Sequence, residues 1–236
     1  CCIHGAFIWG EPGSEFQVRD ASVSAKLFDA CGAARVKRCI LLSSAAVHRP
    51  FAGRMHEDDP IHTADYYGAT KAASELFMHA ACALHRMVGV VVRPGLVVGP
   101  PAFDGASFRS DRRVEKMVAQ AMANVPVAVP DEPARQFTDV SALVRIVRLL
   151  TEINSPRATY VCVDRDAIDW ETVAEIVVRD TKSLDPVLRL AERSATEPPR
   201  FDTARVEEVE GRALDARQAL HAHIRCLMKT QLANGQ

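Results

Sequence analysis

The sequence lacks a surplus of either charge. Its 29 Lys and Arg residues nearly balance its 30 Asp and Glu residues, so the formal net charge is −1. Proteins that bind nucleic acid or an anionic membrane surface need an excess of basic residues. The sequence also lacks any apolar run close to the roughly 20 residues that a membrane-spanning helix requires. We therefore expect neither a nucleic-acid partner nor a membrane partner.

The cysteines lack the spacing of a disulfide framework or a metal site. There are seven, an odd number, and none forms a CxxC pair in this chain of 236 residues. This usage is typical of a reducing compartment, so we expect a cytoplasmic protein. The nearest approach to a ligand set is His79, Cys82 and His85. Residues three apart drift around a helix axis and no fourth ligand is evident, so we predict a half-buried helix face and no metal.

What the sequence does contain is an alternation of apolar runs and helical patterns. Hydrophobic residues make up 48% and charged residues 25%, as in ordinary globular proteins. The opening CCIHGAFIWG fits a buried strand and the loop after it. A helical pattern at 20–34, a strand at 36–44, a helix at 65–87 and a strand at 88–93 follow. This order predicts an α/β fold with a parallel sheet and right-handed crossovers.

The pattern changes after Gly99. We predict a first domain at 1–100 and a mixed substrate-binding region at 101–236, in which the segment 138–163 returns to the first domain. Helices are expected at 114–124, 138–151, 170–179 and 215–232. Short strands are expected at 125–130 and 158–164. A further short helix should begin at a cap formed by Asp202 or Thr203.

One stretch combines Ser, Tyr and Lys at suggestive spacings. Tyr67 and Lys71 are four residues apart, so they lie on one helix face. A free tyrosine has a pKa near ~10 and is a poor base at neutral pH, but a nearby ammonium favours the phenolate. A serine at the end of the preceding strand could hold the same substrate oxygen. Tyr66 has Thr70 at the fourth position and is not expected to take part.

Six ordered segments make the chain resemble the extended short-chain dehydrogenase/reductases, the NAD-dependent epimerase/dehydratase family. The resemblance covers nearly the whole chain and implies a Rossmann-like sheet, present from the family's fourth strand onward, with a small C-terminal substrate domain. The segments are CIHGA, VKRCILLSSAAVH, HEDDPIHTADYYGATKAASE, VVVRPGLVVGP, ARQFTDVSAL and RFDTARVEEVEG.

The resemblance assigns roles by position. Tyr67 becomes the catalytic acid/base and Lys71 its modulator and a ribose ligand. The catalytic serine lies three residues before the motif valine, which is Val47, so it is Ser44 rather than Ser43. The resemblance also implies a second set of residues, which would bind NAD or NADP and the substrate. These are Gly5 and Ala6 near the ribose and pyrophosphate, Pro94 near the nicotinamide, and Arg135 toward a substrate phosphate or, equally, in a surface ion pair.

Several positions depart from the family pattern. His48 and Arg49 replace the usual Tyr and Gly, and Asp20 stands where Asn is common. Ala45 and Ala46 follow the serine where dehydratases and decarboxylases carry an acidic residue, which disfavours elimination of water. We predict that the acidic residues before the tyrosine form a solvated loop; they are Glu57, Asp58 and Asp59.

The family's opening strand, G-x-x-G-x-x-G turn and helix are missing. Gly5, Gly10 and Gly13 do not replace them, because no clear helix start is predicted after them. The first residue is Cys rather than Met. We expect a fragment of a full enzyme, or else a short relative that has lost cofactor binding, and in either case an open edge on the first strand.

The leading hypothesis is an NAD(P)-dependent oxidoreductase or epimerase. It would act on a hydroxyl or keto group of a nucleotide sugar, or of a similar small molecule such as a hydrophobic alcohol or ketone. The alternative is a truncated, non-catalytic member that binds a ligand or a partner chain. A homodimer through the long helices is also open, because Ala72, Ala73, Phe77, Ala80 and Ala81 form a face there that packing on the sheet explains equally well.

Overall fold

The computed structural model describes residues 1–7, 15–103, 111–154, 156, 158–184, 187–189 and 197–234. The chain divides into two compact units. The first unit comprises residues 1–95, 143–162 and 201–213. The second comprises residues 96–142, 163–200 and 214–236.

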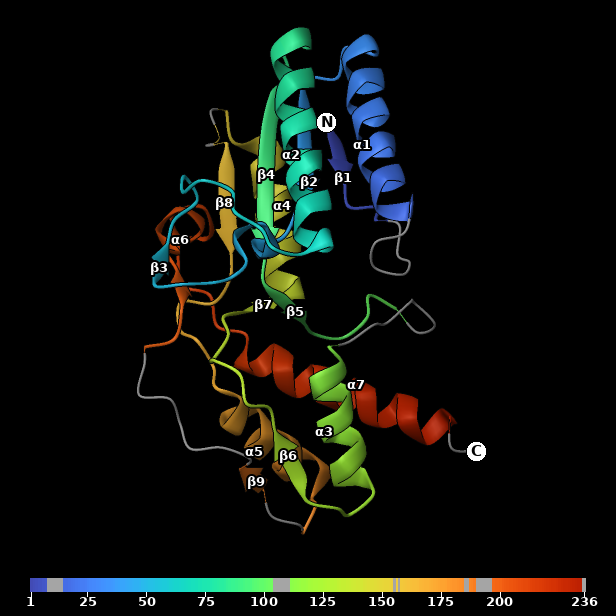
Figure 1. Cartoon of the computed structure of the whole chain (residues 1–236), viewed down its shortest axis with the longest axis vertical. Helices are drawn as coiled ribbons and strands as arrows, with labels where there is room; N and C mark the ends of the chain where they lie inside the picture. The colour runs from blue at the N-terminus through green and yellow to red at the C-terminus, as the bar shows by residue number, and fades with distance from the viewer. Residues whose placement is uncertain are drawn as a thin grey trace. The chain divides into compact units, whose positions relative to one another are not determined.

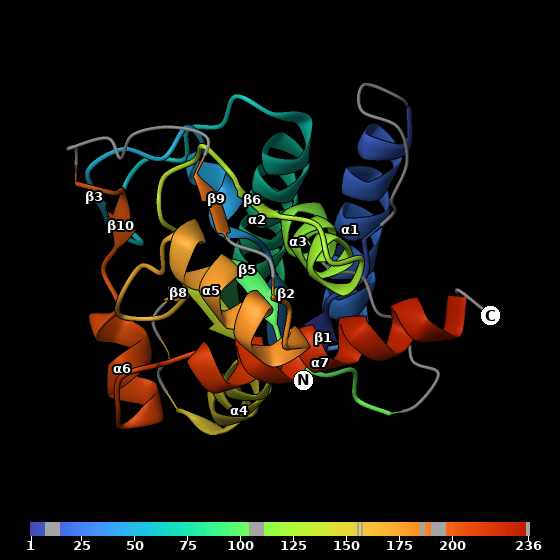
Figure 2. The same cartoon turned by 90° about the horizontal axis from the view of Figure 1, so that it is seen from below.

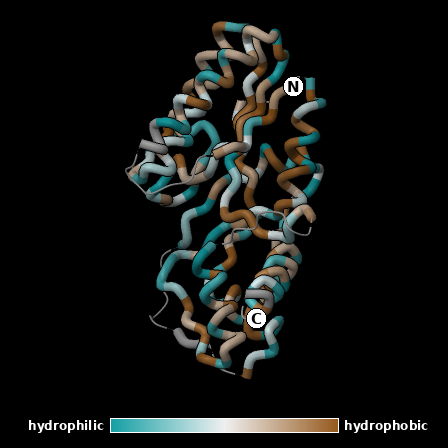
Figure 3. Tube along the Cα trace, turned by 90° about the vertical axis from the view of Figure 1, so that its right-hand side faces the viewer, coloured by the Kyte–Doolittle hydropathy of each residue, from teal (hydrophilic) through white to brown (hydrophobic). Residues whose placement is uncertain are grey.

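The first unit is built on a four-stranded parallel sheet. The strand order is β1-β2-β4-β8. The strands span Cys2–His4, Arg38–Leu42, Val88–Pro94 and Thr159–Cys162. Their central residues are continuous apolar runs, as expected of strands covered on both faces, and Figure 3 shows these stretches mostly in brown. The predicted α/β fold with a Rossmann-like parallel sheet is confirmed.

Helices cover both faces of this sheet. Figures 1 and 2 show α1 (Glu15–Ala33) and α2 (Tyr66–His85) on one face, and α4 (Val140–Glu152) on the other. Each of the first two helices connects neighbouring parallel strands, which is the βαβ arrangement. The carboxyl ends of β1, β2 and β4 therefore meet at one edge of the sheet.

The prediction that no clear helix start follows the first glycines is wrong. Strand β1 precedes Gly5, and α1 begins at Glu15, five residues earlier than the predicted start at 20. Gly10 and Gly13 lie outside the described residues. Within the described residues β1 pairs only with β2, so it forms the edge of the sheet, and Ile3 is 52% exposed there.

Shorter elements complete the first unit. A 3₁₀ turn, η1 (Ala45–His48), follows β2, and β3 (Arg54–Met55) pairs with β10 (Arg200–Phe201). Helix α6 (Ala204–Glu210) follows. Thr203 holds its N-cap position, but its hydroxyl donates to the Glu207 carboxylate and makes no capping bond to the helix backbone. The Asp202 carboxylate accepts a hydrogen bond from the Ala204 amide.

The second unit packs three helices against short parallel strand pairs. The helices are α3 (Arg112–Met122), α5 (Trp170–Thr181) and α7 (Arg217–Asn234). Strand β5 (Leu96–Val98) pairs with β7 (Phe137–Asp139), and β6 (Val127–Val129) pairs with β9 (Val187–Arg189). Trp170, Phe137 and Met117 are among the largest fully buried side chains of its core.

The units place the boundary at Gly95 and Leu96 rather than at residue 100. The returning segment is 143–162 rather than 138–163, and a second return at 201–213 was not anticipated from the sequence. No helix in the described part of the chain is long and apolar enough to cross a membrane.

Candidate active site

Two serines end strand β2, and they face different partners. The Ser43 hydroxyl is buried and donates to the Glu75 carboxylate. Ser44 forms the N-cap of η1, where its oxygen accepts a hydrogen bond of 3.1 Å from the Ala46 amide. Its side chain also lies close enough to Tyr67 to lower the pKa of that phenol. Because the Ser43 hydroxyl is bound to Glu75, Ser44 is the serine that lies beside Tyr67.

The start of α2 places the tyrosine. Asp65 caps the helix by accepting from the Gly68 amide at 2.7 Å. A side chain at Gly68 would come within 2.6 Å of the Ala46 carbonyl oxygen, so only glycine allows the helix to approach η1 this closely. Tyr67 is consequently half-buried beside Ser44, whereas Tyr66 is 62% exposed.

The electrostatics of Tyr67 differ from the expectation. Burial raises its pKa above the ordinary value, and the hydrogen bond with Ser44 and the charge of Arg49 lower it only in part. The Lys71 ammonium is 6.0 Å from the tyrosine ring centre. We expected Lys71 to lower the pKa of Tyr67, but in this structure the pKa of Tyr67 is raised.

Lys71 is held away from bulk water. Its ammonium donates to the Leu42 carbonyl at 3.2 Å and lies 4.7 Å from the centre of the Phe7 ring. The same ring packs edge-on against Tyr67 at 5.1 Å. Burial lowers the pKa of Lys71, and the charges of Asp20 and Glu75 oppose this. Phe7 is therefore a site residue that the sequence analysis missed, since an isolated Phe in an apolar opening carries no signal.

Asp20 adds a buried negative charge to this region. It is 4% exposed on α1, and its charge raises the pKa values of Tyr67, Lys71 and His4. Burial is the largest effect on His4 and lowers its pKa, so the ring is neutral when it hydrogen-bonds the Ser24 hydroxyl at 2.9 Å. The Asp that stands at position 20 in place of the common Asn therefore shifts the pKa values of the proposed acid/base pair, Tyr67 and Lys71.

A buried ion pair lies behind the serine and the lysine. The Arg93 guanidinium donates to both carboxylate oxygens of Glu75, at 3.0 and 2.6 Å, and both side chains are at most 5% exposed. Arg93 also donates to His48 at 2.8 Å and to the Glu57 carbonyl at 3.1 Å. The network therefore joins three residues that each adjoin a proposed site residue. Arg93 precedes Pro94, Glu75 lies one turn after Lys71 on α2, and Ser43 precedes Ser44.

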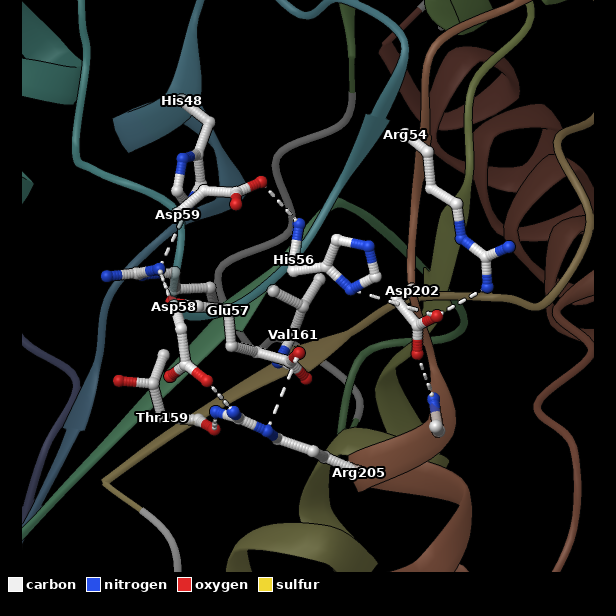
Figure 4. Close-up of polar contacts among 12 residues, drawn as sticks. His48, Arg54, His56, Glu57, Asp58, Asp59, Thr159, Val161, Asp202 and Arg205 are labelled. Atoms are coloured by element: carbon white, nitrogen blue, oxygen red, sulfur yellow. Dashed lines mark hydrogen bonds and ion pairs between the residues drawn. The ribbon is translucent and has the colours of Figure 1, made fainter.

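The acidic loop is solvated only in part, because Asp58 is exposed as predicted whereas Glu57 is buried. Figure 4 shows Glu57, Asp58 and Asp59 among polar contacts in the first unit. Glu57 is 5% exposed; its carboxylate accepts from the Val161 amide and lies 3.8 Å from Arg205. Arg205 also pairs with Asp58. The expectation was wrong for Glu57 because Arg205, more than a hundred residues later, neutralises it.

The proposed cofactor residues occupy the ends of strands. Gly5 and Ala6 follow β1 and are exposed, and Pro94 ends β4 and is buried. A side chain on Gly5 would lie 3.1 Å from the Leu42 side chain, so glycine keeps this strand end open. A hydroxyl, a phenol and an ammonium at this edge fit the nicotinamide ribose. The described residues supply no glycine-rich turn for the pyrophosphate.

Arg135 belongs to the second unit. Its guanidinium is 3.3 Å from Glu132, and Glu132 also binds Arg113. Arg113 in turn pairs with Asp111 and lies 4.3 Å from the Trp170 ring centre. The ion pair considered for Arg135 is present. A phosphate would have to compete with Glu132 for it.

Comparison with protein families identifies the chain. Residues 9–162, more than half of its length, match the NAD dependent epimerase/dehydratase family. The chain belongs to this family, as its sequence motifs predicted, and the family's cofactor is NAD. A search of curated protein sequences returned no significant match.

Solved structures share the fold. The UDP-glucuronic acid 4-epimerase from Bacillus cereus in complex with NAD is 18% identical with a TM-score of 0.79, covering 96% of this chain and 73% of that chain. The UDP-N-acetylglucosamine 4-epimerase from Methanobrevibacter ruminantium is 19% identical with a TM-score of 0.76, covering 97% and 76%. The Bordetella bronchiseptica enzyme WbmG in complex with NAD is 21% identical with a TM-score of 0.74, covering 96% and 71%.

Proposed function

We propose that this chain carries the catalytic side chains of an NAD-dependent nucleotide-sugar epimerase. The observation that carries the proposal is the placement of Ser44 beside Tyr67 at the carboxyl edge of the sheet, with Lys71 on the next turn of α2. Family membership supports the cofactor. The titles of the similar structures, which name UDP-sugar 4-epimerases, support the substrate class.

Each side chain has a role that its surroundings suit. Tyr67 takes the proton from the substrate hydroxyl and later returns it to the same oxygen. Ser44 hydrogen-bonds that oxygen and holds it beside the phenol. Lys71 places positive charge near the ribose, and it would stabilise the phenolate only if its ammonium moved closer to the phenol than it lies in this structure. NAD, when bound, would supply the hydride chemistry, which removes a hydride from the sugar carbon and returns it to the opposite face of the transient ketone.

Gly5, Ala6, Tyr67, Lys71 and Pro94 would hold the nicotinamide end of NAD. Phe7 lies against both Tyr67 and Lys71, so this ring would have to move when the ribose reaches Lys71. We infer no pyrophosphate site from the described residues. In the second unit, Arg135 is proposed to bind a substrate phosphate by exchanging its partner Glu132.

The surroundings of Ser44 disfavour loss of water from the sugar. Elimination needs an additional acid and base near the keto-sugar. The two positions after Ser44 are Ala45 and Ala46, which are 3% and 2% exposed and carry no ionisable group. Among reactions of this family, epimerisation and simple oxidoreduction therefore fit these residues better than dehydration.

Replacing the two neighbouring tyrosines tests the proposal. Tyr67→Phe should lower the rate of epimerisation of UDP-glucuronic acid or UDP-glucose by about 10²–10⁴-fold, because it removes the proton-transfer group. Tyr66→Phe is the matched control and should leave the rate unchanged, since Tyr66 is exposed. Product is followed by chromatography with NAD present. An equal effect of the two changes would refute the role of Tyr67.

A non-catalytic binding protein is the second candidate, favoured by the open edge of β1 among the described residues. Such a protein would bind a UDP-sugar without turnover, and its edge would be covered by a second copy or another chain. Three measurements on one sample distinguish the epimerase from the binding protein. They are calorimetry with UDP-glucose, sedimentation analysis and the rate assay. Binding without turnover at any NAD concentration would favour this candidate over the epimerase.

A further inference from the structure

The apolar core of the first unit is rich in sulfur. The cluster between the sheet and helices α1 and α2 contains Phe28 and Leu41, and Figure 1 shows both helices on that face. Its sulfur-bearing members are the buried Cys31, Cys39, Cys82, Met78 and Met87, with Cys2 packed against them. None of these residues belongs to the proposed catalytic set. All of the cysteines are free thiols.

Three of these thiols converge. Cys2 and Cys39 are paired residues on the neighbouring parallel strands β1 and β2, and Cys31 lies near the end of α1. Their sulfur atoms all lie within 4.8 Å of one another. Burial and the neighbouring Cys31 thiol raise the pKa values of both Cys2 and Cys39. The convergence is tertiary, so the scattered spacing of the cysteines gave no sign of it.

We propose that Cys2, Cys31 and Cys39 form a binding site for trivalent arsenic, taken up as arsenous acid. Three thiols replace the three hydroxyl groups of As(OH)₃. Three arsenic–sulfur bonds form, three arsenic–oxygen bonds break, and each thiol proton leaves with a hydroxyl as water. No oxidant or reductant is needed, and the arsenic remains trivalent.

Charge decides between this ligand and a metal cation. Three thiolates around Zn²⁺ or a monovalent copper ion leave a net negative charge, which is costly in a dry apolar core. The arsenic trithiolate is neutral. Zinc also prefers four ligands, and only three such side chains converge in the described part of the chain. A neutral, three-coordinate, sulfur-seeking ligand therefore fits both the number of thiols and their surroundings.

The position of Cys2 gives the ligand a route. Cys39 is fully buried and Cys31 is 8% exposed, but Cys2 is partly exposed on the short edge strand β1. A small movement of this strand would draw its sulfur toward the other two. Binding would then tie β1, β2 and α1 together, so it should raise the melting temperature of the chain.

The test uses sodium arsenite and the reduced, purified chain without oxygen. Native mass spectrometry should show one arsenic atom bound per chain, with the loss of three hydrogens. X-ray absorption should show three sulfur neighbours. Cys2→Ser should weaken binding and leave no arsenic with three sulfur neighbours, because one of the three arsenic–sulfur bonds is lost. Cys1→Ser is the matched control, since Cys1 is exposed and adjacent but outside the cluster, and it should bind as the parent does.

A second variant guards against misfolding. Cys39→Ala removes the buried ligand, and circular dichroism establishes whether each variant keeps its fold. The proposal is overturned if the parent chain binds no arsenic, if the bound arsenic keeps a hydroxyl and has only two sulfur neighbours, or if folded Cys2→Ser binds as well as the parent. Loss of binding in Cys1→Ser would likewise overturn it, by assigning the arsenic to the adjacent pair Cys1 and Cys2.

Discussion

The two units bury charge in opposite ways. In the first unit, the buried Glu75 and Arg93 satisfy one another with two hydrogen bonds. In the second unit, Asp164 is 2% exposed, and neither of its carboxylate oxygens meets hydrogen-bond geometry with a described residue. The paired charges adjoin the proposed catalytic residues, whereas Asp164 lies near the start of α7, beside Ala216. Paired charge can support a site at all pH values near neutral, whereas an unpaired carboxyl makes stability depend on pH.

Breaking the paired charge should have the largest effect on stability. Arg93→Met leaves Glu75 buried without its partner, and we expect the free energy of unfolding to fall by about 3–5 kcal/mol. Glu75→Leu strands the arginine instead and should cost a similar amount. Denaturant titration followed by circular dichroism measures both.

The double variant sharpens this prediction. Arg93→Met combined with Glu75→Leu removes both charges and should recover much of the lost stability, because no unpaired charge remains. A double variant whose loss equals the sum of the two single losses would show that the residues do not interact. Arg212→Met, at an exposed arginine paired with Glu210, is the control and should change stability by about 1 kcal/mol or less.

Asp164 should produce the next largest effect, with a defined pH window. Burial raises the pKa of this carboxyl from 3.8 to about 7. Between these values the folded state keeps a proton that the unfolded state has lost. The free energy of unfolding therefore falls as the pH rises from about 4 to about 7, and then levels off. The total cost is at most about 4 kcal/mol.

Asp164→Asn removes this titration. The variant should be more stable than the parent at pH 8, and the gain should shrink toward pH 4. Hydrogen exchange of amides in α5 and α7 measures the effect within the second unit. A gain that is the same at both pH values would show that Asp164 is not the titrating group. Asp166→Asn, at an exposed position two residues later, is the matched control.

The same two regions show what the sequence could predict. Apolar runs and helical spacing gave the strands and long helices of the first unit to within a few residues, and motif spacing brought Ser44, Tyr67 and Lys71 together. Short strands such as β3, β5 and β9 were missed, since two or three residues carry no periodicity. The partners of Glu57 and Glu75 were missed as well, because pairing with Arg205 and Arg93 depends on how the chain returns to the sheet.

The smallest expected effect concerns Asp20, a buried charge that acts on the site from a distance. Its carboxylate raises the pKa values of both Tyr67 and Lys71. Asp20→Asn keeps the shape of the side chain and removes the charge, so both pKa values should fall. If the Tyr67 phenolate is the base, the rising limb of the pH–rate profile for sugar oxidation then moves to lower pH, with little change in the maximal rate. Asp29→Asn, on the exposed part of α1, is the control. A limb that stays in place in Asp20→Asn, or moves to higher pH, would show that the buried charge does not tune the tyrosine.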